Sequence, residues 1–338
     1  MKILHAAAIT PHGCGLYETA RDLAAAEREL GHDARLIDST KPHNDRGVPT
    51  GNGYDFIKEC DVIVSHSGPS KEMCKSGKPI VQIRHGRPRS TFLIESHGEG
   101  KIYSYLRNMR ADKQHVAWVT MWPEHKPYWE LVLGREVHVI PPPVDLKAFT
   151  PDGPKGYNWH GKGGAINVVV ADMWRKDKDP FDVINGFAVF AKTHPGSKLH
   201  VFGNTSGMKA WPTLAACLTE HGWLGQTPGH VTGLANAYRA ADMVITPHTC
   251  AVRTIREALA CGCPVVCGSG IAGYLSFSAL SDHPATFADA MHRCLNYDAQ
   301  GGKDARAYAR EYAEAAFDSK KSAQALIDVI TGAINGKQ

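Results

Sequence analysis

The residues best suited to chemistry lie in a polar loop and in the helix that follows it. The segment Ile255-Arg-Glu-Ala-Leu-Ala-Cys-Gly-Cys-Pro-Val-Val266 is typical of a helix that ends at a glycine before a buried strand. A strand-like run, Met243–Thr246, and a polar loop over residues 247–250 precede it. At the carboxyl edge of a parallel sheet, such a loop presents free N–H groups and the helix dipole to an anion. Glu257, in the first turns of this helix, can accept hydrogen bonds from vicinal hydroxyls such as those of a ribose.

Cationic side chains that could neutralise a phosphate occur at two places. Arg253 and Thr254 open the helix just described, and Arg175 and Lys178 follow an earlier strand-like run. Lys178 precedes a helix that we expect to begin near Pro180, so its ammonium and the helix dipole would act on one anion. The alternative at both places is an ordinary solvated basic surface.

Glycines and a histidine form a third group of candidates, in the first half of the chain. Gly13 and Gly15 follow the first strand-like run and would let the backbone approach a diphosphate. His85 ends a strand and could orient a reacting hydroxyl, although a histidine there can also be only a turn residue. Lesser candidates nearby are His12, Glu18 and His66.

Arginines gather after the strand that ends at His85, with Tyr103 and Tyr105 among them. Basic and aromatic side chains together can hold phosphates and stack on bases. An ordinary solvated helix and loop is the alternative. The arginines in question are Arg84, Arg87, Arg89, Arg107 and Arg110.

Short apolar runs alternate with helical patterns, which favours parallel sheets built from β–α–β units. The strands expected in a first half are Ile3–Ala8, Ala34–Ile37, Val62–Val64, Ile80–Ile83, Val116–Val119 and Val137–Ile140. Those expected in a second half are Ile166–Ala171, Leu199–Phe202, Met243–Thr246 and Val265–Cys267. Amphipathic helices are expected over Thr19–Leu30, Phe181–Lys192, Ala235–Ala241, Ala305–Phe317 and Ser322–Ile334.

A proline-rich segment separates the two halves. Ile140–Phe149 contains three consecutive prolines and cannot continue a sheet, and residues 150–164 have the composition of a linker. We expect a first domain over residues 1–155 and a second over 156–319, with a helix over about 320–338 packing back on the first. Ligands favour a cleft between the carboxyl edges of two such sheets.

Composition narrows the class of protein. A chain of 338 residues is long enough for two cores, and no apolar run reaches the roughly 18 residues of a transmembrane helix. The first ten residues are too short for a secretory signal and favour a first strand. Nine irregularly spaced cysteines favour free thiols in a reducing compartment, so we expect a cytoplasmic protein. The net charge of +4 is modest for a nucleic-acid binder, so any polyanion-binding surface must be local.

The order of several motifs resembles the retaining family 4 glycosyltransferases of the GT-B fold (glycosyltransferase group 1). The helix with Glu257 resembles their Glu-Ala-x-Ala-x-Gly-x-Pro-Val-Val segment, and Val139–Phe149 resembles their Ile-Pro-Asn-Gly-Val-Asp segment. The remaining matches are Gly13-Cys-Gly-Leu-Tyr-Glu18, Leu30-Gly-His32, Ile83-Arg-His-Gly86, Val201-Phe-Gly203 and Tyr238-Arg-Ala-Ala-Asp242.

The resemblance implies an α/β enzyme with two Rossmann-like domains whose parallel sheets face an interdomain cleft. Such an enzyme moves a sugar from a UDP- or GDP-sugar to an acceptor hydroxyl, with no bound metal or cofactor. Cationic side chains and N–H groups would then stabilise the diphosphate leaving group. The implied catalytic residues are His85 and Glu257. The implied donor-binding residues are Gly13, Gly15, Arg175, Lys178, Arg253, Thr254 and Glu257, and an acceptor path would use Arg84, Arg87, Arg89, Arg107 and Arg110.

The chain departs from the family pattern at the donor loop. Thr249 stands where the family often carries a first glutamate, and the loop from Pro247 to Glu257 is short and lacks glycines. The donor sugar and the retaining stereochemistry are therefore less constrained than the fold. The acceptor also stays open between a soluble glycan, a small molecule and hydroxymethylated DNA, the acceptor of some bacteriophage enzymes. A nucleotide-sugar epimerase and a non-catalytic nucleotide-sugar or nucleic-acid binding protein are the alternative classes.

Overall fold

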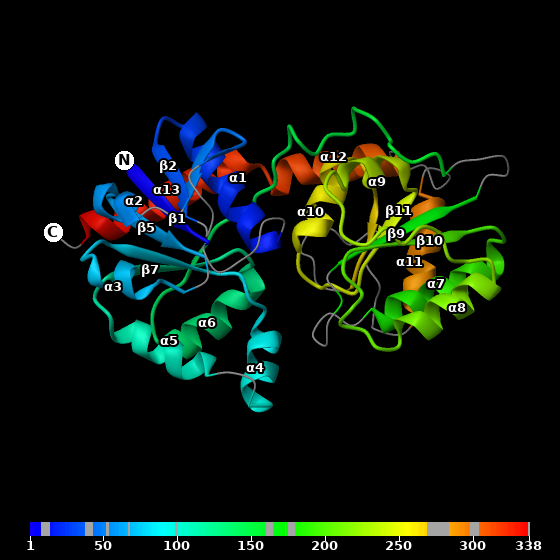
Figure 1. Ribbon diagram of the computed structural model, residues 1–338, viewed down its shortest axis with the longest axis horizontal. Helices are drawn as coiled ribbons and strands as arrows, with labels where there is room; N and C mark the ends of the chain where they lie inside the picture. Colours follow the sequence, from blue (N-terminus) through cyan, green and yellow to red (C-terminus); the bar gives the residue numbers. More distant parts are fainter. Residues whose placement is uncertain are drawn as a thin grey trace. The chain divides into compact units, whose positions relative to one another are not determined.

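The chain forms two compact units, each with its own parallel sheet (Figure 1). The computed structural model describes residues 1–7, 14–37, 43–51, 54–66, 68–98, 101–159, 165–172, 174, 180–268, 284–297 and 304–336. Unit 1 comprises Met1–Pro143 and Phe317–Gln338, and unit 2 comprises Val144–Ala316.

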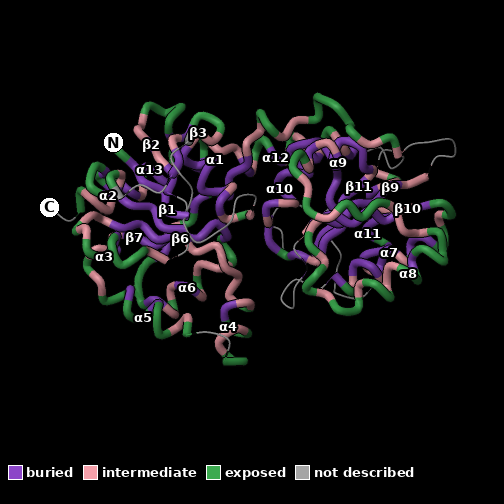
Figure 2. Tube along the Cα trace, viewed as in Figure 1, coloured by how far each residue is buried: buried purple, intermediate pink, exposed green. Residues whose placement is uncertain are grey.

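The sheet of unit 1 has the strand order β3-β4-β2-β1-β5-β6-β7-β8 among the described residues. All its pairings are parallel except that of β3 with β4. The strands are β1 (Lys2–Ala6), β2 (Asp33–Ile37), β3 (His43–Asp45), β4 (Val48–Gly51), β5 (Val62–Ser65), β6 (Ile80–Arg84), β7 (His115–Thr120) and β8 (His138–Val139). The central strands are buried along their length, as expected for apolar runs covered by helices on both faces (Figure 2).

Helices α1 (Gly15–Glu29) and α13 (Ser319–Asn335) pack against each other, and α13 also contacts β7. Apolar side chains of α2 (Tyr54–Glu59) and α3 (Lys71–Lys75) form a core with β1, β5 and β6. A second core joins β7 to α5 (Ile102–Ala111) and α6 (Lys126–Leu133), with Trp118 and Trp129 at its centre. The shorter helix α4 (Pro88–Ser96) and the 3-10 turn η1 (Pro123–His125) follow the ends of β6 and β7.

The hairpin of β3 and β4 was not among the expected strands. Its turn places Arg46 at φ 51° and Gly47 at φ 85°, the two positive values that a tight type I′ hairpin turn requires. Both strands are short, so periodicity gave little signal. The Arg46-Gly47 pair between two short strands was the cue that could have revealed it.

Unit 2 has the strand order β10-β9-β11-β12 among its described residues, with every pairing parallel. These strands are β9 (Asn167–Ala171), β10 (Lys198–Phe202), β11 (Met243–Ile245) and β12 (Val265–Val266). Its helices are α7 (Phe181–Thr193), α8 (Trp211–Glu220), α9 (Ala235–Ala240), α10 (Arg253–Ala260), α11 (Pro284–Leu295) and α12 (Ala305–Ala316). Helix α7 packs on α11, and α10 packs on α9 and α12.

The expectation of an α/β protein with parallel sheets in both halves is confirmed. Every strand expected from the sequence is present, with ends that differ by one or two residues. In the part of the chain that the structure describes, no helix has the length and apolar character needed to cross a membrane.

Candidate functional site

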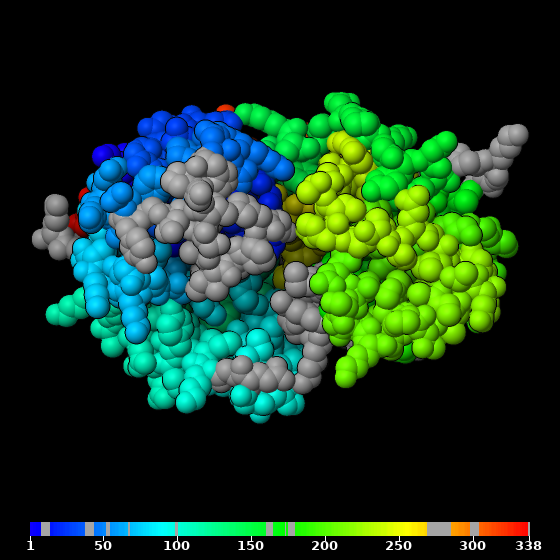
Figure 3. Space-filling view, viewed as in Figure 1, coloured from blue at the N-terminus to red at the C-terminus, as the bar shows by residue number. Residues whose placement is uncertain are grey.

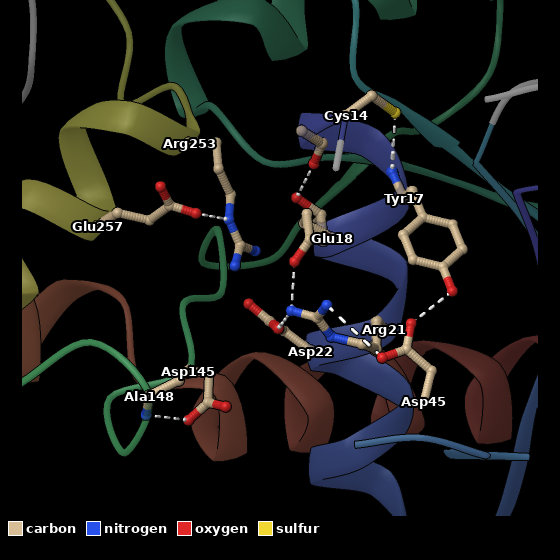
Figure 4. A network of polar contacts seen from close by, with 12 residues as sticks. Cys14, Tyr17, Glu18, Arg21, Asp22, Asp45, Asp145, Ala148, Arg253 and Glu257 are labelled. Carbon is tan, nitrogen blue, oxygen red and sulfur yellow. Dashed lines mark hydrogen bonds and ion pairs between the residues drawn. The ribbon is translucent and has the colours of Figure 1, made fainter. Parts of the chain in front are cut away.

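Helix α10 carries an ion pair at its N-terminal end. The Nε of Arg253 lies 2.5 Å from Oε1 of Glu257, one turn further along, and the two side chains point toward each other (Figure 4). Both residues are less than a tenth exposed. Val252 caps the helix without a side-chain hydrogen bond. The first turn of α10 therefore offers backbone N–H groups beside a buried guanidinium–carboxylate pair, which suits a ligand with both phosphate and hydroxyl groups.

The far end of α10 is held in place by two arginines of α12. Arg310 Nη1 donates to the carbonyl oxygens of Ala260 at 2.7 Å and Phe149 at 2.9 Å, and Arg306 donates to that of Gly262. Gly262 adopts φ 67°, the left-handed conformation that ends a helix. The C-terminal carbonyls of α10 thus have cationic partners, which fixes the helix that presents Glu257.

A second carboxylate contact lies where β9 and β11 end, at one edge of the unit 2 sheet. The Oδ2 of Asp172 lies 2.5 Å from Nε2 of His248, which is buried in the loop after β11. Gly203, after β10, adopts φ 105°, and a Cβ there would lie 1.8 Å from the carbonyl oxygen of Asp172. The glycine of the Val201-Phe-Gly203 motif is therefore required by the close approach of two strand ends. Sequence reasoning did not identify Asp172 or His248.

The polar loop between β11 and α10 packs tightly. A Cβ on Gly268, after β12, would lie 2.8 Å from the carbonyl oxygen of Pro247 and 3.0 Å from the Thr249 methyl group. Thr249 itself is exposed, and Thr254 is half-buried on α10. The threonine at the position of the family's first glutamate thus lies on the surface of unit 2. The predicted phosphate ligands Arg175 and Lys178 lie outside the described residues.

In unit 1 the N-terminus of α1 follows the first strand, as predicted. Gly15 is its first residue, and the Sγ of Cys14 caps it by accepting from the backbone N–H of Tyr17. Gly13 and His12 lie outside the described residues. The first turns of α1 carry a network of charged side chains, shown in Figure 4. Arg21 pairs with Glu18 and Asp22, and it lies 4.0 Å from Asp45 of β3.

His85 is the outer end of a chain of buried polar side chains. Its Nε2 lies 2.9 Å from Nδ1 of His66, whose Nε2 lies 2.8 Å from Nδ1 of His5. The Nε2 of His5 in turn lies 2.7 Å from Oε2 of Glu27 on α1. His5 and Glu27 were not predicted. Their only signal was a histidine inside an apolar strand and a glutamate on the buried face of a helix.

Arg84, next to His85, has no carboxylate partner among the described residues. Its guanidinium lies 4.8 Å from the centre of the Trp129 ring, and its buried Nε has no hydrogen-bond acceptor there. Burial lowers the pKa of Arg84 to about 10, partly opposed by Tyr105. The Tyr105 hydroxyl lies close to where a Cβ on Gly68 would be, so a larger residue there would require the Tyr105 side chain to move.

The five predicted acceptor arginines do not form one group. Arg87 caps α4 and lies near His125, whose pKa falls to about 4 through burial and the charge of Arg87. Arg110 instead lies beside Gly134, which ends α6. Because α5 runs antiparallel to β6 and β7, its last turn lies at the opposite edge of the sheet from Arg84. Arg110 thus contacts the end of α6, and its place on an acceptor path with Arg84 stays a prediction.

The other two arginines, Arg89 and Arg107, are exposed. In Figure 3 the cyan segment that contains α4 and α5 forms part of the surface of unit 1. Phe92 and Leu93 of α4 are also exposed, by 56% and 37%, so this surface is mixed rather than uniformly basic. Within the described residues, no three His, Cys, Asp or Glu side chains are arranged to hold a metal ion.

Comparison with known proteins finds resemblance in sequence over part of the chain. It is 28% identical over 220 residues to a D-inositol 3-phosphate glycosyltransferase of Paenarthrobacter aurescens (strain TC1), covering 59% of this chain and 52% of that protein. The chain thus matches about half the length of this curated relative. No family model matches the chain.

Comparison of structures finds resemblance over the whole chain. HepE of Anabaena, solved with UDP and glucose, has a TM-score of 0.73 at 17% identity, covering 98% of this chain and 99% of that one. An alpha-glucosyltransferase solved with UDP and a 13-mer DNA containing an HMU base has a TM-score of 0.68 at 13% identity, covering 98% and 99%. The structural neighbours are GT-B glycosyltransferases, and this chain has the GT-B fold.

Proposed function

We propose that this protein transfers a sugar from a UDP- or GDP-sugar to an acceptor hydroxyl, and that it needs no divalent metal. The observation that carries the proposal is α10 of unit 2, where the buried Arg253–Glu257 pair stands at a helix N-terminus. That arrangement occurs in a chain whose fold is shared with proteins solved with UDP.

Two kinds of protein group would hold the donor: hydrogen-bond donors for its phosphates and a carboxylate acceptor for its ribose. Phosphate oxygens would accept from the first N–H groups of α10 and from Arg253, with Thr254 beside them. Ribose hydroxyls would donate to Glu257, which then shares its two oxygens between the ribose and Arg253. Arg175 and Lys178 would add positive charge at the diphosphate, and Gly13 and Gly15 would let the first-domain backbone approach it.

Nucleotide binding in excess chelator tests the donor proposal. Calorimetric titration with UDP and with GDP should give a measurable Kd that chelator leaves unchanged. Loss of affinity in chelator would contradict the metal-free proposal. Absence of binding to both nucleotides, with and without Mg²⁺, would contradict the donor site itself.

For the acceptor we propose a molecule that carries an anionic group near its reacting hydroxyl. Arg84 supports this, because a largely buried guanidinium without a carboxylate partner among the described residues is costly unless a ligand neutralises it. His85, next along the chain, would hydrogen-bond to the hydroxyl. The retaining stereochemistry implied by the family resemblance is part of this proposal.

Product analysis distinguishes the proposed transferase from the two alternative classes, a nucleotide-sugar epimerase and a non-catalytic binding protein. An acceptor-dependent release of UDP or GDP is expected, with the sugar found on the acceptor and its anomeric configuration read by NMR. An epimerase would release nucleotide without an acceptor, and a binding protein would release none. Donors should be screened against phosphorylated sugars, neutral oligosaccharides and hydroxymethylated DNA.

A further inference from the structure

Phe149 joins the segment after the proline run to both ends of helix α10. Its backbone carbonyl accepts from Arg310 Nη1 at 2.9 Å, and the same nitrogen donates to the carbonyl of Ala260, the last residue of α10, at 2.7 Å. The guanidinium of Arg253, the first residue of α10, lies over the Phe149 ring, with its Cζ 5.7 Å from the ring centre. All of these residues belong to unit 2. The Phe149 side chain thus reaches the end of α10 that carries the Arg253–Glu257 pair.

The motif Val144-Asp-Leu-Lys-Ala-Phe149 folds the turn that presents this ring. The N–H of Phe149 donates to the carbonyl of Asp145 at 2.9 Å, which closes one helical turn. The carboxylate of Asp145 accepts from the backbone N–H groups of Lys147 at 2.9 Å and Ala148 at 3.0 Å, as the side chain of an N-cap does (Figure 4). The aspartate and the phenylalanine of this motif are therefore the two ends of one local structure.

The backbone on the other side of Phe149 is also held on unit 2. Arg239 of α9 donates from Nη1 to the carbonyl of Thr150 at 3.1 Å and from Nε to that of Pro154 at 2.9 Å. Phe149 itself is only partly buried. Backbone hydrogen bonds on both sides therefore fix the position of this residue, and a change of its side chain removes none of them.

The ring and the carboxylate act on the Arg253 guanidinium in different ways. Glu257 accepts a hydrogen bond from Nε at 2.5 Å, whereas the Phe149 ring attracts the cation through the electrons of its face. A phenylalanine side chain has no hydrogen-bonding atom. Phe149 can therefore orient Arg253 without competing with a phosphate oxygen for its N–H groups.

We propose that Phe149 is a positioning residue for the donor diphosphate, because its ring holds the Arg253 guanidinium beside the first N–H groups of α10. This role rests on the proposed function, in which Arg253 binds a phosphate of the donor. The contacts with Phe149 and Glu257 restrict the guanidinium before the donor binds, so less side-chain entropy is lost on binding. The ring increases the affinity for ligands that carry the diphosphate and leaves the affinity for the nucleoside part unchanged.

Phe149→Leu removes the ring and keeps an apolar side chain. It should weaken UDP binding by about 2- to 30-fold, the range of cation–π contacts from exposed to desolvated sites, and leave the affinity for uridine unchanged. Phe149→Tyr keeps the ring and should bind UDP as tightly as the wild type. Calorimetric titration measures UDP, and competition against UDP measures uridine. An equal loss for UDP and uridine, or an unchanged affinity for UDP, would overturn the proposal.

Phe56→Leu is the matched control. Phe56 is a partly buried phenylalanine of unit 1, and the Arg35 guanidinium lies 4.8 Å from its ring centre. This variant loses a contact of the same kind at a place with no proposed ligand, so it should lower the Tm without changing UDP affinity. If Phe56→Leu and Phe149→Leu weakened UDP binding equally, a general loss of stability would explain both and the proposal would be overturned.

A double-mutant cycle tests whether Phe149 acts through Arg253. Arg253→Gln removes the cation and keeps an amide that can donate to Glu257. In that background Phe149→Leu should have no further effect on UDP affinity, whereas independent roles would give additive losses. Additive losses would therefore contradict the positioning role. Phe149→Met takes the place of Phe149→Leu in the cycle if the leucine variant does not fold.

The orientation of Arg253 can also be measured without nucleotide. In protein labelled with ¹⁵N-arginine, the Nε–H signal that Arg253→Gln removes belongs to Arg253. Rotation about its Nε–Cζ bond should be faster in Phe149→Leu than in the wild type, and unchanged in Phe56→Leu. If UDP and GDP fail to bind while this difference is observed, the donor proposal fails and the positioning of Arg253 by Phe149 stands. Equal rotation in the wild type and Phe149→Leu would overturn the positioning role itself.

Discussion

The Nε of Arg253 lies 2.5 Å from Oε1 of Glu257, and an equivalent pair, Arg310 Nε with Glu314 Oε1 at 2.6 Å, occurs on α12. Both pairs join residues four apart on one helix. They differ in exposure, because the α10 pair is buried and Glu314 is half exposed. The same contact is therefore buried on α10 and lies at the surface on α12.

Glu257→Ala should weaken UDP or GDP binding by about 1.5–3 kcal/mol, the value of hydrogen bonds to a charged group. It should also lower the Tm, because Arg253 is left buried without its carboxylate. Glu314→Ala is the control, and loss of an exposed pair should cost about 0.2–1 kcal/mol of stability with no effect on binding. Calorimetry at a temperature where both variants are folded measures the two affinities. Equal affinity for Glu257→Ala and wild type would assign this carboxylate a structural role only.

Gly203→Ala should destabilise unit 2 by more than about 2 kcal/mol, because its Cβ would overlap the carbonyl oxygen of Asp172. Gly196→Ala is the control. Gly196 has a similar φ of 89° but nothing within 4 Å of a new Cβ, so it should lose only about 1 kcal/mol from backbone strain. Urea unfolding measures both. Similar losses in the two variants would show that the approach of Gly203 to Asp172 is less tight than described.

Stability should fall as pH drops from about 6.5 toward 4. Burial lowers the pKa of His200 to about 4, and Lys198 adds to the effect, so the folded protein keeps this ring neutral while the unfolded chain protonates it. At pH 4 this residue alone should cost about 3 kcal/mol relative to pH 7. His200→Gln should flatten the curve of unfolding free energy against pH, whereas replacement of the exposed His221 should not. An unchanged slope in His200→Gln would contradict the assignment.

If hydroxymethylated DNA is the acceptor, its binding should weaken steeply with salt. Log affinity should fall by roughly 0.9 per phosphate contact per tenfold rise in salt. Replacing Arg87 and Arg89 with Ala should reduce that slope by about two contacts and leave UDP binding intact. Arg110→Ala is the control, because Arg110 lies beside the end of α6. A salt-insensitive reaction, or equal slopes in all variants, would leave a glycan or small-molecule acceptor.

Much of the fold was predictable because buried parallel strands read as apolar runs, and the helices between them end at glycines. The predicted strand Ile166–Ala171 matches β9 to within one residue, and the helix that carries Glu257 ends before Gly262, as predicted. The β3–β4 hairpin was missed because its strands are only three and four residues long and have no apolar run, so its turn residues carry the main signal. The strand and helix pattern thus predicts the elements with a continuous apolar run, including the edge strands β8, β10 and β12, and misses the short β3–β4 hairpin.

The candidate site was predictable only where one segment carries several of its features. Glu257 and Arg253 lie on the same helix, so spacing alone places them together. His5 and Glu27 are 22 residues apart and meet only because α1 packs on β1. Arg110 is on the last turn of α5, and its side chain lies beside Gly134 at the end of α6. This contact depends on how the two helices pack, which the spacing of arginines in the sequence does not indicate.

The division of the chain into units has a consequence for the order of synthesis. Unit 1 is interrupted after Pro143 and resumes at Phe317, so all of unit 2 is translated before α13 exists. Until then the surfaces of α1 and β7 that α13 covers, including the partners of the buried Leu326 and Ile330, stay open to solvent. The nascent chain can therefore complete its second unit while its first is unfinished, and α1 and β7 gain their α13 contacts only when translation has passed Asn335.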